Sequence, residues 1–430
     1  MSILVLLVVR SIRRLLLLSA WLAPLAVPVA ATQHPLPQHH ATPPAKPNIL
    51  VILTDDQDLH MDSLSYMPNL QKHLIDEGLF FRHHYCTVAL CCPSRASIWT
   101  GKAAHNTNIT DVNPPHGGYP KFVSQGFNDN YLPLWLQDLG YTTYYTGKLF
   151  NAHSVVNYNK PFPRGWNESD FLLDPYTYEY LNATFQQNTD PPVSHEGSYS
   201  TDVLINKSLA FLTAAVSQRP DHPFFLTIAP TAPHSNVHIH SALINSTFTN
   251  KSVTQSPPIP AARHAHLFEN ITVPRTPHFN PSQPQRGSAS WISNLPLQNG
   301  TNIAFNDHFY RSRLRALQPV DELIDSIIAK LEAAGQLENT YIIYTTDNGY
   351  HIGQHRLQPG KQCAFEEDVS VPFIVRGPGV PRGVSTGGGV VTNHVDIAPT
   401  ILRLAGWEAG AGEERVGMVE KFGLDGAVMP

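Results

Sequence analysis

Five short, uninterrupted apolar runs recur along the chain, and each is followed by a cluster of polar residues, glycine or proline. They cover residues 48–53, 141–146, 224–228, 341–344 and 371–375. Runs of this kind are typical of strands buried on both faces of a sheet. Helical patterns lie between them at 200–216 and 309–331, and Asp396 is expected to cap a short helix that ends at Gly406. This alternation predicts an α/β fold with a mostly parallel, mixed central sheet flanked by helices.

Polar side chains follow several of these expected strands at the point where each strand ends. In open α/β sheets, ligands bind outside the carboxyl ends of the strands, so these distant residues are expected to converge in one cleft. The oxygen ligands among them suit Ca²⁺ or Mg²⁺ rather than zinc. They are Asp55, Asp56, Asp347 and Asn348. The alternative is that they only form turns, as Asp and Asn commonly do at strand ends.

Three positively charged or titratable side chains complete the expected cleft. Lys148 follows the second run, His234 follows the third, and Lys361 lies in a loop rich in Gly, His and Gln. Each of them, taken alone, would be a solvated surface or loop residue. Together they predict an anion-binding site beside a metal ion.

The segment 89–101 places two thiols, Cys91 and Cys92, directly before a proline and close to Arg95. Pro93 suits a first helical position, so Cys91 is expected at the positive end of a helix with Arg95 one turn away. Both features lower the pKa of a thiol and favour a neighbouring anion, which indicates a nucleophile facing an anionic substrate. The alternative is a cysteine pair that packs at a helix start.

The N-terminal segment has the pattern of a targeting sequence. Arginines precede an apolar run at 15–31 that ends in small residues, so 1–31 is expected to be a signal peptide and 32–47 a linker rich in Pro and His. A signal anchor is the alternative, and no later run is long enough to span a bilayer. The net charge of −5, without a long basic stretch downstream, argues against nucleic acid as a partner.

Sequons and cysteine content fit a secreted glycoprotein. Most of the eight N-x-S/T sites lie between 167 and 301, and 235–300 is expected to be a glycosylated excursion over the surface. The sites begin at Asn108, Asn167, Asn182, Asn206, Asn245, Asn250, Asn270 and Asn299. Four cysteines are too few for disulfides to hold the fold together, although Cys86 with Cys363 is one bridge that the sequence allows.

The segment 89–101 resembles the sulfatase signature, C-x-P-S-R followed by small and apolar residues and Thr-Gly. The other motifs stand in sulfatase order: Asp-Asp-Gln and Gly-Lys at strand ends, a Pro-His turn, and Asp-Asn-Gly with a lysine downstream. The resemblance runs from about residue 48 to residue 430 and implies the alkaline-phosphatase-like α/β fold. The Cys-Cys pair, Tyr350-His351 and the segment 320–323 most resemble N-acetylglucosamine-6-sulfatases and related fungal-type arylsulfatases.

The resemblance also implies a role for each motif residue. A formylglycine-generating enzyme that reads Pro93 and Arg95 would oxidise Cys91 to formylglycine, and the hydrated aldehyde, steadied by Arg95, would attack the sulfur of a sulfate ester. One Ca²⁺ would be held by Asp55, Asp56, Asp347, Asn348 and the residue derived from Cys91. Sulfate oxygens would be bound by Lys148, His234 and Lys361. Either His234 or Lys361 would lie near the leaving oxygen.

Two features depart from the sulfatase pattern. Many sulfatases have a histidine two residues after the Gly-Lys lysine, where this chain has Phe150; Asn151 or His153 could take that role, or the role could be absent. Residues 48–407 correspond to a catalytic domain, whereas 408–430 correspond only to the start of the C-terminal subdomain with which family members usually continue. The sequence therefore predicts a secreted, Ca²⁺-dependent hydrolase of aryl or carbohydrate sulfate esters, without a stable membrane anchor.

Two alternatives remain at this level. A phosphodiesterase-type hydrolase of the same superfamily would use Ser or Thr as the nucleophile and more metal-binding His and Asp residues, so Cys91 argues against it. An inactive secreted glycoprotein that keeps the fold is favoured by the short C-terminal part and disfavoured by the complete set of motif residues.

Overall fold

The computed structural model describes residues 46–218, 222–244, 247–283, 289–408, 417 and 421–430. The chain divides into Met1–Pro44, which lies outside these residues, and Ala45–Pro430, which contains every described helix and strand. The expected signal peptide and nearly all of the expected linker are outside the described residues, so both stay predictions. Within the described ranges, no helix combines the length and the apolar character needed to cross a membrane.

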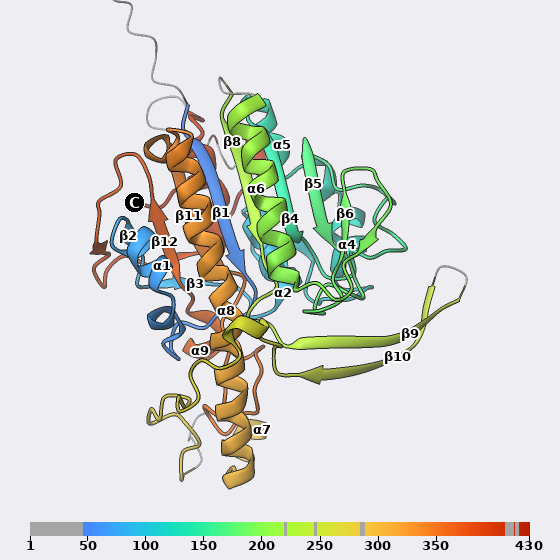
Figure 1. Cartoon of the computed structure of the whole chain (residues 1–430), viewed down its shortest axis with the longest axis vertical. Helices are drawn as coiled ribbons and strands as arrows, with labels where there is room; N and C mark the ends of the chain where they lie inside the picture. Colours follow the sequence, from blue (N-terminus) through green and yellow to red (C-terminus); the bar gives the residue numbers. More distant parts are fainter. Residues whose placement is uncertain (1–45, 219–221, 245–246, 284–288, 409–416, 418–420) are drawn as a thin grey trace, which may run out of the picture. The chain divides into compact units, whose positions relative to one another are not determined.

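A ten-stranded sheet forms the centre of the fold, in the order β13-β2-β12-β11-β1-β8-β4-β5-β6-β7 (Figure 1). The central strands run parallel, and they are β11 (Thr340–Thr346), β1 (Asn48–Thr54), β8 (Phe224–Ala229), β4 (Thr142–Lys148) and β5 (Glu168–Leu172). The outer strands are β13 (Val384–Ser385), β2 (Leu79–Phe80), β12 (Phe373–Arg376), β6 (Thr184–Gln187) and β7 (Val193–Ser194). Because β12 and β6 run antiparallel to their inner neighbours, the sheet is mixed.

Helices cover both faces of this sheet. One face carries α6 (Ser200–Gln218) and α8 (Gly300–Ala333), which lie in front of the central strands in Figure 1. The other face carries α2 (Cys91–Thr100), α5 (Leu132–Asp138) and α10 (Ile397–Leu404). The short elements are η1 (Ser63–Tyr66), α1 (Pro68–Leu70), η2 (Gln71–Ile75), β3 (His84–Tyr85), α3 (Ala104–Thr107), α4 (Gly118–Ser124), η3 (Phe127–Asp129), η4 (Ala262–His264), α7 (Ser290–Ser293), η5 (Leu337–Asn339), α9 (Glu366–Val369), β14 (Thr392–Asn393) and η6 (His394–Asp396).

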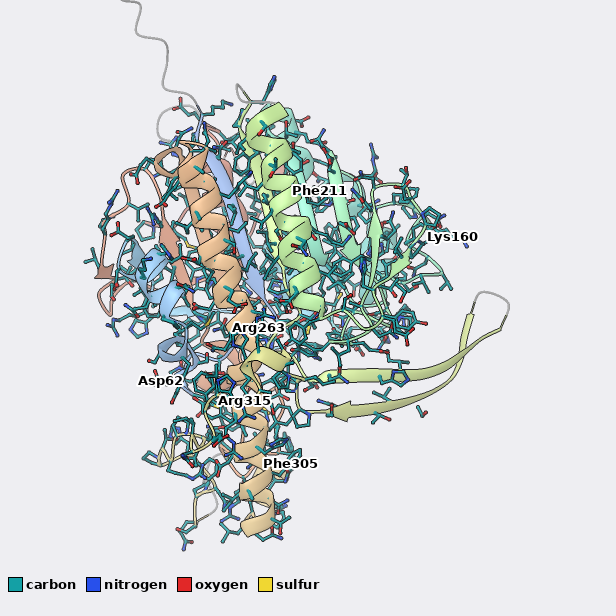
Figure 2. All side chains as sticks on the ribbon, in the orientation of Figure 1. Asp62, Lys160, Phe211, Arg263, Phe305 and Arg315 are labelled. Carbon is teal, nitrogen blue, oxygen red and sulfur yellow. The ribbon has the colours of Figure 1, made fainter. Side chains whose placement is uncertain are left out.

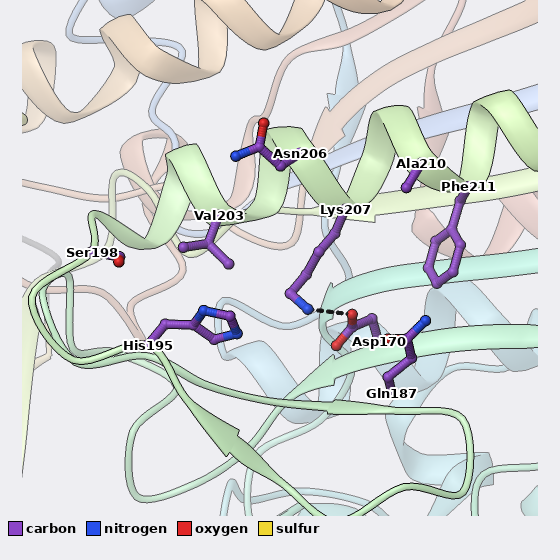
Figure 3. A pocket seen from close by; sticks show the side chains of 9 residues that line it. All are labelled: Asp170, Gln187, His195, Ser198, Val203, Asn206, Lys207, Ala210 and Phe211. Carbon is purple, nitrogen blue, oxygen red and sulfur yellow. Dashed lines mark hydrogen bonds and ion pairs between the residues drawn. The ribbon is translucent and has the colours of Figure 1, made fainter.

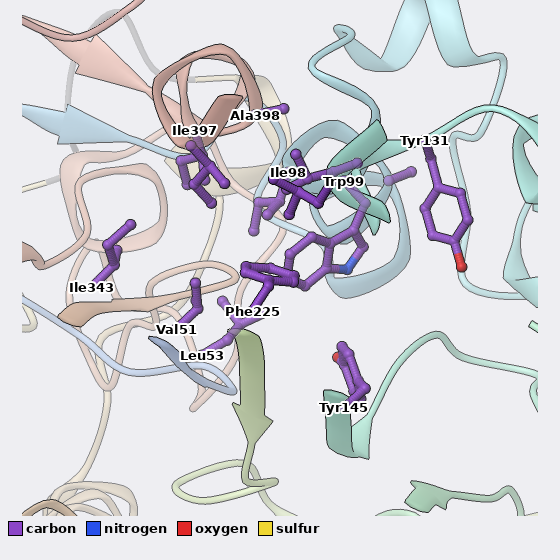
Figure 4. Packing of buried hydrophobic residues seen from close by; sticks show 14 of the residues in the cluster. Val51, Leu53, Ile98, Trp99, Tyr131, Tyr145, Phe225, Ile343, Ile397 and Ala398 are labelled. Carbon is purple, nitrogen blue, oxygen red and sulfur yellow. The ribbon is translucent and has the colours of Figure 1, made fainter. Parts of the chain in front are cut away.

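Strand β1 shows why an uninterrupted apolar run marks a buried strand. Successive side chains point to opposite faces, and here both faces are covered by helices, so neither set can be polar. Val51 and Leu53 join the core that contains Trp99 of α2 (Figure 4), whereas Leu50 and Ile52 join the core under α6 and α8.

The apolar runs form strands at the expected places, except that the fifth forms β12, which runs antiparallel to β11. The helical pattern at 309–331 is part of the longer α8, because Asn299 and Asn302 form a capping box that starts the helix earlier. Asp396 is the N-cap residue of α10, as predicted, but its side chain makes no capping hydrogen bond there. Its carboxylate accepts hydrogen bonds from the backbone N–H groups of Asn393 and Ala427 at 2.9 Å each, so it closes the preceding turn and holds the C-terminal residues.

The segment 235–300 is more regular than its sequence predicts. β9 (Asn236–Ile244) and β10 (Thr247–Ser256) form an antiparallel hairpin that extends away from the sheet (Figure 1). β9 begins with a short alternation of polar and apolar residues at 236–240, but the alternation is not sustained through β10, which is rich in Thr and Ser, so the segment as a whole shows no clear period. Beyond the hairpin, the chain packs along the N-terminal half of α8, the part around Phe305 and Arg315 that reaches past the strand ends (Figure 2).

Candidate active site

The ends of four neighbouring strands bring the predicted site residues together. Asp55 and Asp56 follow β1, Asp347 and Asn348 follow β11, Lys148 ends β4, and His234 comes shortly after β8. These four strands are adjacent in the sheet, in the order β11-β1-β8-β4. Asp56 adopts a left-handed backbone with φ of 68°, and its N–H donates to Asp347 Oδ1 at 3.1 Å. The convergence that the sequence predicts is therefore present.

The start of α2 delivers Cys91 to the same place. Cys91 Sγ lies 3.5 Å from Asp55 Oδ1 and 2.7 Å from Lys361 Nζ. The next thiol points elsewhere: Cys92 belongs to the apolar core, and its sulfur accepts a hydrogen bond from the Gly118 N–H at 3.2 Å. The Cys91 thiol therefore faces the strand ends, and the Cys92 thiol packs in the apolar core.

The predicted lowering of the Cys91 thiol pKa is wrong. Burial, together with the Asp55 carboxylate, raises the pKa of the Cys91 thiol well above its usual range, although Lys148 and Lys361 oppose this. Arg95, expected to assist the thiol, is aimed at Asp347 instead, and its Nε donates to Asp347 Oδ2 at 2.8 Å. Burial beside Asp55 therefore disfavours the thiolate form of Cys91.

Two fully buried cations, Lys148 and Arg95, lie beside the Asp55 carboxylate and offset its negative charge. Lys148 Nζ donates to Asp55 Oδ2 at 2.5 Å, and Arg95 Nη2 lies 3.6 Å from the same oxygen. Burial alone would raise the pKa of Asp55, but Lys148, His234 and Arg95 outweigh it and hold this pKa below its usual value. Asp55 is therefore an anion at neutral pH.

Lys361 approaches the site from the loop between β11 and α9. Its ammonium contacts Asp56 Oδ1 and Cys91 Sγ and lies 3.4 Å from Asn348 Oδ1. Burial would raise the pKa of Asp56, but Lys361 and His234 lower it by more. The ammonium therefore contacts three of the five expected metal ligands.

His234 borders the cluster with a defined tautomer. Its Nδ1 lies 2.8 Å from the Ser235 carbonyl oxygen, so Nδ1 carries the proton in the neutral ring and Nε2 faces Asp56 Oδ2 at 3.6 Å. The ring stacks on Tyr178 with centroids 4.1 Å apart. Burial lowers the pKa of His234 despite the two carboxylates nearby.

The donor set fits a hard divalent cation. Carboxylate and amide oxygens converge from two strand ends, and the Lys361 ammonium already stands among them as a positive charge. Asp55, Asp56, Cys91 and His234 each offer a ligand atom, all within 4.8 Å of one another. Carboxylate-rich sets of this kind suit Ca²⁺ or Mg²⁺.

Comparison with known proteins gives the family. The sequence matches the Sulfatase family over residues 47–407. The chain belongs to the sulfatase family. It is 45% identical over 368 residues to an arylsulfatase of Volvox carteri and 33% identical over 370 residues to an N-acetylglucosamine-6-sulfatase of Homo sapiens. These matches cover 84% of this chain but only 56% and 62% of the two relatives, so the chain spans somewhat more than half of their length.

Solved structures establish the alkaline-phosphatase-like fold of this sulfatase chain. One similar protein was solved in complex with its substrate D-glucosamine-2-N,6-O-disulfate. Its superposition on this chain gives a TM-score of 0.64 at 22% sequence identity and covers 90% of this chain and 81% of that one. A phosphonate monoester hydrolase from Silicibacter pomeroyi has a TM-score of 0.60 at 20% identity, over 89% and 75% of the two chains. Because the fold is shared with a phosphonate hydrolase, it does not select the ester by itself.

The sulfatase site contains residues that the sequence did not single out. Arg313 of α8 is 1% exposed, and its Nη2 donates to the Asp56 carbonyl oxygen at 2.5 Å and to Asp58 Oδ1 at 3.1 Å. It thereby fixes the backbone at Asp56. Its position on the same helical face as Leu317 and Val320 is the signal that could have revealed it, because an arginine on an apolar face needs a buried partner.

The structure shows which of the two candidate replacements for the missing sulfatase histidine, Asn151 or His153, lies near the site. Asn151 Nδ2 donates to the Tyr178 hydroxyl at 2.6 Å, and the Tyr178 ring lies between His234 and the Lys148 ammonium, which is 4.7 Å from the ring centre. His153 instead packs against Tyr119 and Phe171 in the interior and is 0% exposed. Of the two candidates, only Asn151 reaches the site, and it does so through Tyr178.

The structure has no disulfide bridge between Cys86 and Cys363. Cys86 and Cys363 are both free thiols, so the suggested bridge between them is wrong. Cys86 Sγ donates to the Asp368 carbonyl oxygen at 3.4 Å, and the Cys363 N–H donates to Asp368 Oδ2 at 2.7 Å. Each cysteine is held by Asp368 rather than by the other sulfur.

A hollow of about 420 Å³ lies apart from the motif residues, between α6 and the strands β5 and β6 (Figure 3). Lys207 and Asp170 form an ion pair of 2.5 Å across it, and His195 lies at one end. None of the predicted site residues lines it. The strand-end cluster is therefore the candidate active site.

Proposed function

We propose that this chain hydrolyses sulfate monoesters through a formylglycine formed from Cys91. The observation that carries the proposal is the place of Cys91, between Asp55 and Lys361 where four strand ends meet the start of α2. A thiol with a raised pKa is a poor nucleophile, so the unmodified side chain suits this position badly. Within the sequence C-x-P-S-R it suits conversion to an aldehyde.

Asp55, Asp56, Asp347 and Asn348 would hold one Ca²⁺ together with the residue at position 91. Their oxygens provide the hard ligands that this ion prefers. When bound, the ion supplies positive charge that polarises a sulfate oxygen. Arg95 and Arg313 would keep two of these ligands in place, through Asp347 Oδ2 and the Asp56 backbone respectively.

The lysines would offset the repulsion between an anionic substrate and an oxygen nucleophile. Burial alone would lower the pKa of Lys148, but Asp55 outweighs it, so the ammonium stays protonated. The same balance, with Asp56 as the main partner, holds for Lys361. Both can therefore donate hydrogen bonds to sulfate oxygens throughout the neutral pH range.

A hydrated aldehyde supplies one oxygen that bonds to sulfur while the bond from sulfur to the alcohol oxygen breaks, and a second hydroxyl whose deprotonation later expels sulfate and restores the aldehyde. The departing alcohol oxygen needs a proton. Lys361 is protonated and contacts Asp56, so it can deliver that proton, whereas His234 can do so only when its Nε2 also carries one.

We further propose secretion as a glycoprotein and a substrate that is an aryl sulfate or a 6-sulfated glucosamine. The relatives named above are arylsulfatases and N-acetylglucosamine-6-sulfatases, and a putative extracellular sulfatase of Caenorhabditis elegans is 35% identical over 362 residues. The expected signal peptide and the eight sequons support the same compartment.

The test uses full-length protein secreted by cells that contain a formylglycine-generating enzyme. With Ca²⁺ present, 4-nitrophenyl sulfate should be hydrolysed much faster than 4-nitrophenyl phosphate, and Cys91→Ala should abolish turnover. Cys92→Ala is the matched control and should retain it, because that thiol faces the core. Peptide mass spectrometry should find an aldehyde at Cys91 and a thiol at Cys92.

Two outcomes would overturn the proposal. One is protein with formylglycine demonstrated at position 91 that hydrolyses none of a panel of aryl and sugar sulfates. The other is a Cys91→Ala variant as active as the wild type.

A further inference from the structure

Among the described residues, two groups of metal-type side chains lie outside the strand-end cluster: His351 with Cys363 and Asp368, and a group that contains two histidines. His278, His355 and Glu367 each present a ligand atom, and these three atoms lie within 4.8 Å of one another. His278 Nδ1 is 3.4 Å from Glu367 Oε1, and His355 Nε2 is 3.2 Å from Glu367 Oε2. None of them takes part in the sulfate chemistry described above.

The separations also fit ligands of one ion, although His355 Nε2 lies within hydrogen-bonding distance of Glu367 Oε2. Three histidines outside any metal-type group hydrogen-bond a carboxylate at 2.7–2.9 Å, namely His73, His238 and His264, whereas the exposed His60 lies 3.7 Å from Glu366. Ligand atoms at about 2.0–2.2 Å from a tetrahedral zinc ion lie about 3.3–3.6 Å from one another. The two nitrogen–oxygen distances at Glu367, 3.4 and 3.2 Å, are longer than the distances in those hydrogen-bonded pairs. They are close to the spacing between two ligand atoms of one zinc ion.

The backbone holds the two imidazoles together. The His355 N–H donates to the His278 carbonyl oxygen and the Asn280 N–H to the Gly353 carbonyl oxygen, both at 2.8 Å. The ring of Phe365 stacks on His355 with centroids 3.6 Å apart, which fixes the plane of the imidazole. The site is thus positioned before any ion arrives.

The local backbone is also strained. His355 and Arg356 adopt left-handed conformations in succession, with φ of 57° and 66°. Such conformations are unfavourable for residues other than glycine and concentrate where a side chain must be aimed for function. From this backbone, His355 Nε2 faces Glu367 Oε2.

We propose that His278, His355 and Glu367 bind a zinc ion. Two imidazoles and one carboxylate form a three-ligand set that zinc prefers, whereas Ca²⁺ would require six or more oxygens. His278 has a side chain that is 58% exposed, so the fourth position opens to solvent and can take water. The set therefore differs in chemistry from the oxygen cluster around Asp56.

The ion would brace the loop that carries Lys361. The Tyr350 N–H donates to the Glu367 carbonyl oxygen at 2.8 Å, and the Gly349 N–H to the Asp368 carbonyl oxygen at 2.9 Å. Both ends of the loop from Gly349 to Glu367 therefore meet beside the candidate active site, and Lys361 lies between them. Zinc at Glu367 would fix that end of the loop.

The test measures zinc in the full-length protein by competition with a chromophoric chelator, in excess Ca²⁺ so that the oxygen cluster is filled. The wild type should bind one zinc per chain, and Co²⁺ in its place should give the visible absorption of a tetrahedral site. His278→Ala should weaken zinc binding more than about 100-fold, because loss of a direct ligand exceeds the 10–100-fold effect of outer-shell changes. His355→Ala should do the same.

His238→Ala is the matched control, because it also removes a partly exposed histidine that contacts a glutamate. It should leave zinc affinity unchanged. Thermal melts in excess Ca²⁺ would show that the variants are folded. The proposal is overturned if the wild type binds no zinc, or if folded His278→Ala binds zinc as tightly as His238→Ala does.

Discussion

Replacement of Arg95 by methionine should destabilise the fold strongly, because the guanidinium neutralises carboxylates that water cannot reach. The side chains of Arg95, Asp55 and Asp347 are all 0% exposed. Methionine retains much of the apolar volume but removes the donor to Asp347 and the charge beside Asp55. Removal of one partner of a buried ion pair costs about 3–5 kcal/mol, since the other charge remains buried.

Guanidinium titration of the purified protein would measure this loss in the free energy of unfolding. For a chain of this size the unfolding entropy is about 0.8 kcal/mol/K, so a loss of about 4 kcal/mol corresponds to a shift of about 5 °C in Tm. Arg164→Met is the control, because Arg164 and Asp129 are 61% and 64% exposed and such pairs contribute about 0–1 kcal/mol. Equal losses in the two variants would refute the reasoning.

Three further predictions concern single residues. Asp347→Asn should weaken Ca²⁺ binding about 10-fold or more in calorimetric titrations, because it removes a ligand charge; unchanged affinity would exclude Asp347 from the ligand set. Lys361→Met should slow sulfate hydrolysis while leaving Ca²⁺ affinity equal or higher, and weaker Ca²⁺ binding would contradict the placement of its ammonium. His153→Phe should reduce acid sensitivity. Burial lowers the pKa of His153 from 6.5 to about 3, so between these values the unfolded chain binds a proton that the folded chain does not, and stability falls as the pH falls. From pH 7 to pH 5, unfolding titrations should show the wild type losing about 2 kcal/mol more than the variant, and equal losses would disprove a neutral buried ring.

The parts of the fold that the sequence predicts are those in which local pattern and tertiary environment coincide. A parallel strand covered on both faces must be apolar throughout, so β1, β4, β8 and β11 are visible as runs. Their carboxyl ends share one edge of the sheet, so the polar residues that follow them must meet. Neither inference requires knowledge of a distant contact.

The parts that it misses depend on contacts across the chain. Asp56 is fixed by Arg313, which is 257 residues away in the sequence. The sequence-based prediction of the Cys91 thiol pKa used only the helix start and Arg95. In the structure, burial and the neighbouring Asp55 determine the direction in which this pKa shifts. The hairpin β9–β10 carries only a short apolar alternation at 236–240, and its antiparallel pairing joins strands that the sequence pattern does not link.

The charges around Cys91 balance without an added ion, and this gives Lys361 two roles. Three carboxylates, Asp55, Asp56 and Asp347, face three cations, Arg95, Lys148 and Lys361. Arg95 and Lys148 lie beneath the carboxylates and are fully buried, whereas the Lys361 ammonium contacts Asp56, Asn348 and Cys91, which are the expected ligands of Ca²⁺. If these atoms hold a divalent ion, it would take the place of the ammonium, and Lys361 would move away from them. The ion would then replace one positive charge by two and release a lysine to meet the sulfate, and both changes favour an anionic substrate.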